Sequence, residues 1–264
     1  MTGIHSVVSD GKAASSDKKA AEEFLKKFEK VIYREGYIPQ QDFNCDETGL
    51  FWKKMPSGTY ITAEKRKLSG HKLIKYSLTL AFYANASGDL KIKPLLVYHS
   101  ENHRKLQNIT IERLLVFWKF NAKAWVTRTI FIELLNVCFG PAVKNFLEAN
   151  NLPLKCLLVL DNAPAHPPGL EDIIHPDFSF IKALCLPPNT TPLLQPMDQQ
   201  VIASFKKLNT KHLFKRCFEV TESTQLTLHE FWKGYFDIDQ CLRMIDKAWN
   251  EVSRRTLNSS WKKL

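Results

Sequence analysis

Residues 157–166 read LLVLDNAPAH, and this stretch decides how the rest of the chain is interpreted. Four aliphatic residues run directly into Asp161, and an Asn-Ala-Pro sequence follows. A continuous apolar run of this kind is typical of a strand buried on both faces. A carboxylate at the end of such a strand is either a turn residue or a metal ligand, and the stretch alone does not distinguish the two.

The composition indicates a globular protein with a polyanionic partner. The 264 residues are 44% hydrophobic, which is enough for a sizeable core. The net charge of +10 favours a polyanion without distinguishing DNA, RNA or an acidic membrane. No apolar run approaches the length of a bilayer span and the start of the chain has no signal core, so we expect an intracellular protein and no membrane partner. The six scattered cysteines lack zinc-binding spacing and are expected to be reduced.

Periodicity along the chain predicts alternating layers of helices and strands. Residues 17–36 have helical spacing, and residues 42–99 predict three antiparallel strands. The first strand is expected to turn at Gly49, and Asn-Ala-Ser-Gly-Asp at 85–89 predicts a hairpin between the other two. Further elements are expected in chain order: a helical region at 121–150, buried strands at 154–161 and 178–189, and helices at 198–216 and 227–252.

This order of elements is that of the ribonuclease H-like fold. We therefore expect an α/β protein with a mixed five-stranded sheet, made of three antiparallel strands and then two further strands. Helices should flank the sheet, with extra helices at the N- and C-terminal ends. Residues 1–15 are expected to be a disordered N-terminus, and residues 16–264 to form one domain in which 218–264 is a C-terminal helical extension.

Three aspartates fall at places that this fold brings together. Asp46 lies on the first strand, Asp161 ends the fourth, and Asp198 begins the helix after the fifth. Clustered carboxylates repel one another, and two Mg²⁺ or Mn²⁺ ions would compensate. Two such metal ions stabilise both the attacking and the leaving oxygen of a phosphodiester. We predict that the three aspartates are catalytic and metal-binding, and that strand alternation points the competing Glu47 to the opposite face.

Other polar side chains are candidates for supporting roles. His166 is expected to orient the turn after the fourth strand, with a proton shuttle or a phosphate contact as alternatives. Asn162 either binds a metal-coordinated water or caps the turn. Candidate DNA-phosphate contacts come from two basic runs, at 53–75 and 206–216. They are Lys53, Lys54, Lys65, Arg66, Lys67, His71, Lys72 and Lys206, of which His71 and Lys72 fit a solvated loop nearly as well.

Seven motifs, matching in order and spacing from about residue 13 to the end, resemble the transposase domain of Tigger elements in the pogo group. Jerky-type and centromere protein B family proteins share this ancestry. The resemblance implies a DDE endonuclease domain in which Asp46, Asp161 and Asp198 occupy the catalytic positions. It also implies metal-dependent DNA cleavage and strand transfer, and a nuclear location. The motifs are FNCDETGLFWKKMPSGTYI (43–61), GHK (70–72), KPLLVYHSEN (93–102), KAWVT (123–127), LLVLDNAPAHPP (157–168), LPPNTTPLLQPMDQ (186–199) and LNSSWKKL (257–264).

Two residues depart from the family pattern, which usually has glycine at both positions. Ala165 is a mild change if its φ is negative and a strained one if it is positive. Gln200 is expected one turn into a helix, where glutamine is a good residue.

The short polar start leaves no room for the helix-turn-helix modules of related proteins, so we expect a truncated or domesticated copy. It would act as a homo-oligomer or with a partner that supplies those modules. The alternatives are a non-catalytic nuclear DNA-binding or chromatin protein and a relic without function.

Overall fold

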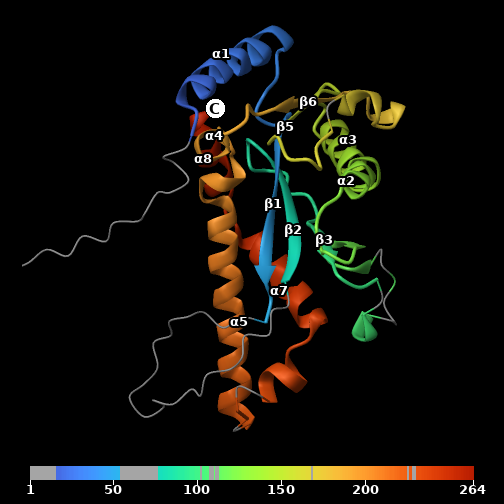
Figure 1. The fold of residues 1–264 in the computed structure, drawn as a ribbon, viewed down its shortest axis with the longest axis vertical. Helices are drawn as coiled ribbons and strands as arrows, with labels where there is room; N and C mark the ends of the chain where they lie inside the picture. Colours follow the sequence, from blue (N-terminus) through green and yellow to red (C-terminus); the bar gives the residue numbers. More distant parts are fainter. Residues whose placement is uncertain are drawn as a thin grey trace, which may run out of the picture.

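The computed structural model describes residues 16–53, 77–101, 103–106, 110, 113–167, 169–224, 226–227 and 230–264. The predicted disorder of residues 1–15 lies outside the described residues. Within the described part, a mixed sheet of six strands runs through the molecule with helices on both faces (Figure 1). The strands are β1 (Asp42–Phe51), β2 (Ser77–Asn85), β3 (Leu95–Tyr98), β4 (Phe117–Phe120), β5 (Cys156–Leu160) and β6 (Ile181–Cys185).

The strand order β4-β3-β2-β1-β5-β6 confirms the ribonuclease H-like arrangement. β1, β2 and β3 pair antiparallel, while β5 lies parallel to β1 and β6 parallel to β5. The expected count of five strands is wrong, because β4 pairs with β3 in parallel at the edge of the sheet. β4 has only four residues, so its own sequence carries little periodicity and its identity as a strand depends on its pairing with β3.

The expected turn at Gly49 is also wrong. Gly49 lies opposite Thr79 within the β1–β2 ladder, and β1 continues to Phe51. Glycine weakens a strand but does not interrupt its hydrogen bonds, and the long pairing with β2 holds it extended.

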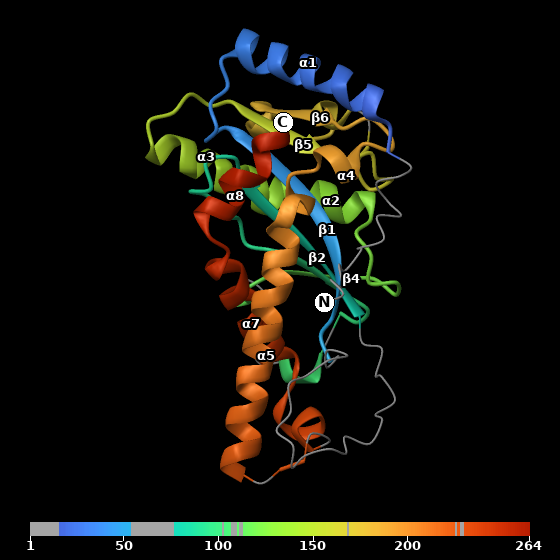
Figure 2. The ribbon, with the colours of Figure 1, turned by 90° about the vertical axis from the view of Figure 1, so that its left-hand side faces the viewer.

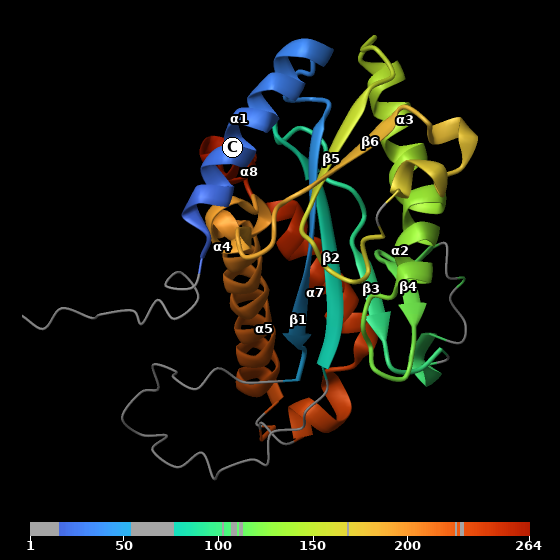
Figure 3. The same ribbon diagram turned by 45° about the horizontal axis from the view of Figure 1, so that its top comes forward.

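The helices cover the two faces of the sheet unequally. α2 and α3 lie on one face, joined by a π-helical turn at Leu135–Phe139 (Figure 3). The long α5 lies over β1 and β2 on the other face (Figure 2). The helices are α1 (Lys18–Glu35), α2 (Arg128–Leu134), α3 (Gly140–Ala149), α4 (Thr191–Leu194), α5 (Ile202–Thr224), α7 (Ile238–Glu251) and α8 (Arg254–Ser260).

Alternation along β2 divides the core into two layers. The Phe82 ring points toward α5 and α7, with its centroid 4.4 Å from that of Phe205 and 4.5 Å from that of Trp249. The next residue, Tyr83, points to the opposite face and packs against Phe139. Trp249 also donates its indole N–H to the carbonyl of Ile92 at 3.1 Å. α7 therefore forms part of the core that covers the α5 face of the sheet.

The helical run at 128–149 contradicts one expectation from the sequence. It spans 22 residues and is long and apolar enough to cross a bilayer. In the structure this run lies on the sheet, and Phe131, Leu135, Phe139 and Leu147 are fully buried. A core helix meets the same criteria of length and composition, so its packing accounts for its apolar character.

Candidate functional site

The parallel pairing of β1 and β5 places two of the predicted aspartates side by side, where β5 ends next to β1. Asn44 lies opposite Val159 in this ladder. Asp46 and Asp161 each follow two residues later, so alternation directs both to the same face. Asp46 is only 7% exposed, whereas Asp161 follows the end of β5 and is partly exposed.

The third aspartate joins this group from the turn that precedes α5. Asp198 is exposed and lies in the turn Met197–Val201. Burial raises the pKa of Asp46 well above its ordinary value, and the negative charges of Asp198, Glu47 and Asp161 raise it further. The backbone N–H of Glu47 opposes this by donating to Asp46 Oδ1 at 2.8 Å. The structure thus places the three predicted carboxylates close enough for the charges of Asp161 and Asp198 to act on Asp46.

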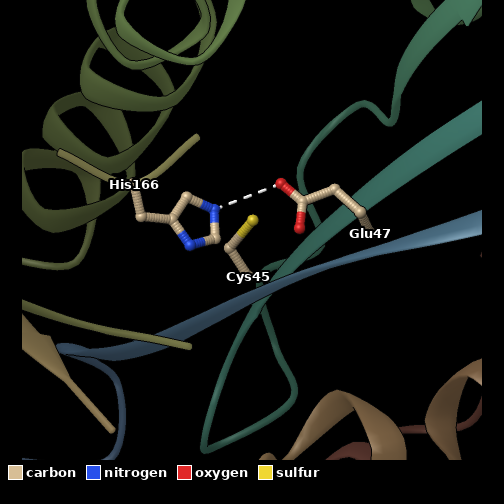
Figure 4. A group of neighbouring side chains, drawn as sticks. All are labelled: Cys45, Glu47 and His166. Atoms are coloured by element: carbon tan, nitrogen blue, oxygen red, sulfur yellow. Dashed lines mark hydrogen bonds and ion pairs between the residues drawn. The ribbon is translucent and has the colours of Figure 1, made fainter. Parts of the chain in front are cut away.

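His166 is buried between two carboxylates. Its Nδ1 lies 2.8 Å from Asp161 Oδ1. Its Nε2 lies 3.2 Å from Glu47 Oε1, and Figure 4 shows this second contact. Burial lowers the pKa of His166, but the hydrogen bonds to Asp161 and Glu47 outweigh it and raise the pKa to about 10. His166 is thereby connected to the turn after β5 through Asp161. Its roles in orienting that turn, as a proton shuttle or as a phosphate contact all stay predictions.

Glu47 faces away from Asp46, as strand alternation predicts, and its neighbours form a second set of ligand-type atoms. Among the described residues, the donor atoms of Cys45, Glu47 and His166 all lie within 4.8 Å of one another (Figure 4). Metals bind the thiolate form of cysteine. Burial raises the pKa of the Cys45 thiol well above its ordinary value, and the charge of Glu47 adds to this. The group consists of the His166–Glu47 contact at 3.2 Å and the buried Cys45 thiol beside it.

The turn after β5 is capped by Asp161 rather than by its neighbour. Asp161 Oδ1 accepts from the backbone N–H of Ala163 at 3.1 Å, while Asn162 is exposed. Ala165 is not among the described non-glycine residues with positive φ. The replacement of glycine by Ala165 is therefore the mild case.

Gln200 is not helical, and the expectation from the sequence is wrong here. Its φ of 76° and ψ of −10° place it in the left-handed region, and Gln199 before it is also non-helical. The regular helix α5 starts only at Ile202. The backbone of the turn that carries Asp198 is therefore non-helical before α5 begins. At Gln200 this turn needs a left-handed conformation, which favours glycine.

Of the predicted DNA contacts, two lie in the described part of the chain. Lys206 lies on α5. Partial burial lowers the pKa of Lys206 below its ordinary value, and the charges of Asp198 and Asp46 offset only part of this effect. Lys53 donates its Nζ to the carbonyl of Trp232 at 3.2 Å and lies over the Trp52 ring. The remaining candidates lie outside the described residues: Lys54, Lys65, Arg66, Lys67, His71 and Lys72.

The sequence did not indicate two buried amides beside the aspartates. Asn44 Nδ2 donates to Gln195 Oε1 at 2.8 Å, and Gln195 Nε2 donates to the carbonyl of Cys45 at 3.0 Å. Both residues are fully buried. The one available signal was an asparagine inside a predicted strand, because asparagine is depleted from strands.

Known proteins resemble this chain over nearly its whole length. It is 30% identical over 259 residues to human Tigger transposable element-derived protein 7, covering 95% of the chain and 47% of that protein. It is 29% identical to the human Jerky protein homolog, covering 99% of the chain and 44% of that protein. The chain thus spans less than half the length of these relatives.

A solved structure and a family model also match. The Mos1 mariner paired-end complex with Mn gives a TM-score of 0.47 at 14% identity, covering 99% of the chain and 68% of that chain. The family model described as DDE superfamily endonuclease matches residues 75–261, well over half of the sequence. This chain therefore belongs to the DDE superfamily endonuclease family.

Proposed function

We propose that this chain is a transposase-derived DNA endonuclease domain in which Asp46, Asp161 and Asp198 bind two Mg²⁺ or Mn²⁺ ions. The observation that carries the proposal is the buried Asp46 carboxyl, whose ionisation is opposed by the charges of Asp198, Glu47 and Asp161. Divalent cations would relieve this repulsion. Hard carboxylate oxygens, with few protein groups for each ion, suit Mg²⁺ or Mn²⁺.

Residues around the three aspartates would hold the carboxylates in place and attract a phosphodiester. Cations held there would supply Lewis-acid stabilisation of charge on the phosphodiester oxygens. The Glu47 N–H fixes Asp46 Oδ1, and His166 fixes Asp161. Lys206 lies near the carboxylates and would attract the DNA backbone. Exposed lysines continue along α5 at 207, 211 and 215, which supports a DNA partner and a nuclear location.

A non-catalytic role is the second candidate. The fold would then serve a nuclear DNA-binding or chromatin protein, acting as a homo-oligomer or beside a partner that supplies DNA-reading modules. Gln200 favours this alternative, because a left-handed non-glycine residue strains the turn two residues after Asp198. Binding of Mn²⁺ separates the two candidates, since only the first requires it.

A nicking assay tests the catalytic proposal. The purified chain is incubated with supercoiled plasmid and Mn²⁺ and compared with Asp161→Ala and Asp177→Ala. Asp177 is an exposed acid outside the site and serves as the matched control. We expect Mn²⁺-dependent nicking that Asp161→Ala abolishes and Asp177→Ala retains. Nicking that survives Asp161→Ala rejects the mechanism, and the absence of Mn²⁺ binding at millimolar concentration favours the non-catalytic role.

A further inference from the structure

We propose that Asn44 is a positioning residue whose side-chain amide joins the three segments that carry the carboxylates. The role of those carboxylates rests on the function proposed above. The joining itself is a property of the fold, and it is measurable without metal or DNA.

Asn44 lies near the start of β1 and joins it to the two other segments. It is fully buried, and its Nδ2 donates to the carbonyl of Val159 and to Gln195 Oε1, each at 2.8 Å. Its Oδ1 accepts from the backbone N–H of Met197 at 2.9 Å. One side chain therefore connects β1, β5 and the segment that leads to Asp198.

Gln195 completes the connection from the other side. It accepts from Asn44 and donates its Nε2 to the carbonyl of Cys45, the residue after Asn44. The two amides thus fasten residues 195–197 to β1 at two neighbouring points. Because both side chains are fully buried, loss of either amide would leave a buried polar group without its partner.

The positions of these contacts along the chain connect them to the carboxylates. Asn44 lies two residues before Asp46, and Val159 lies two residues before Asp161. Met197 directly precedes Asp198. At about 3.3 Å per residue in a strand, each contact lies within roughly 7 Å of its aspartate along the chain. A shift of any one segment against Asn44 would therefore move a carboxylate relative to the other two.

Asp198 depends most on this connection. Gln199 and Gln200 after it have non-helical backbone conformations, so Asp198 lies outside the regular helix α5. The Met197 N–H donates to Asn44 and Asn44 donates to Gln195, and these two bonds attach the turn of Asp198 to the sheet. Metal sites need such supporting contacts to keep their ligands within a few tenths of an ångström.

The test compares Asn44→Ala with Asn85→Ala. Asn85 is the matched control, because it is equally buried. Its side chain forms hydrogen bonds with residues of the turn after β2 and with the carbonyl of Gln40. Hydrogen exchange of metal-free protein should accelerate at least tenfold at residues 195–201 in Asn44→Ala and remain unchanged there in Asn85→Ala. Mn²⁺ affinity should fall about 10- to 100-fold in Asn44→Ala. If Asn44→Ala does not fold, Gln195→Met should show the same changes in the same direction.

The outcomes separate this inference from the proposed function. If Asn44→Ala matches Asn85→Ala in exchange and in Mn²⁺ affinity, while the wild type binds Mn²⁺, the positioning role is wrong and the function stands. If exchange accelerates as expected but the wild type binds no Mn²⁺, the joining of the segments is supported and the metal proposal fails.

Discussion

Replacing Gln200 with glycine should stabilise the protein, although glycine usually destabilises. Gln200 has a φ of 76°, and its side chain is exposed. A left-handed conformation costs a residue with a Cβ about 1–2 kcal/mol, and glycine avoids this cost. Glycine also gains freedom in the unfolded chain, which offsets about 0.5–1 kcal/mol. The net effect should be a gain of about 0.5–1 kcal/mol in the free energy of unfolding.

Thermal unfolding measures this gain. For a domain of this size, 1 kcal/mol shifts Tm by about 2–4 °C, so Gln200→Gly should raise Tm by about 1–4 °C. Gln200→Ala is the control, because it removes the same polar group but keeps the Cβ that causes the strain. We expect no comparable rise in Gln200→Ala. A Tm for Gln200→Gly at or below that of Gln200→Ala would refute the assignment of strain to this residue.

Three other substitutions probe the fold. Burial raises the pKa of Asp42 to about 7 from an ordinary 3.8, so the folded state binds this proton more tightly than the unfolded state. The free energy of unfolding should then fall by roughly 4 kcal/mol as pH rises from about 4 to 7. Denaturant titrations of Asp42→Asn at several pH values should lack this decrease with pH. A decrease equal to that of the wild type contradicts the assignment. Gly140→Ala would place a Cβ 2.6 Å from the Phe178 ring and should cost about 1–3 kcal/mol by urea unfolding. Combination with Phe178→Ala should show non-additivity, and simple additivity of the two losses excludes the clash. Lys91 donates to three carbonyls around the end of α7, so Lys91→Met should cost about 1.5–3 kcal/mol in the same assay, and a neutral result denies this capping role.

Local pattern was enough for most of the strands and helices and for the faces of Asp46 and Asp161. The apolar run that ends at Asp161 predicted a buried strand, and β5 is fully buried from Cys156 to Leu160. Alternation placed Asp46 and Glu47 on opposite faces, and the structure agrees. These predictions succeed because the side-chain pattern within one element reports which of its faces is buried.

Pattern failed where the deciding partner lies far away in the chain. The edge strand β4 depends on its pairing with β3, and Asn44 bonds Gln195 across 151 residues. Neither partner leaves a periodic signature in the local sequence.

The sequence by itself thus determined the order of the strands and helices other than β4, the family motifs and the residue types of the candidate site. Only the tertiary structure decided the backbone of Gln200, the pairing of His166 with both Asp161 and Glu47, and the amide connection at Asn44. The physical reason is that hydrogen bonds between distant segments, and not helix propensity, set the path of the chain around Asp198.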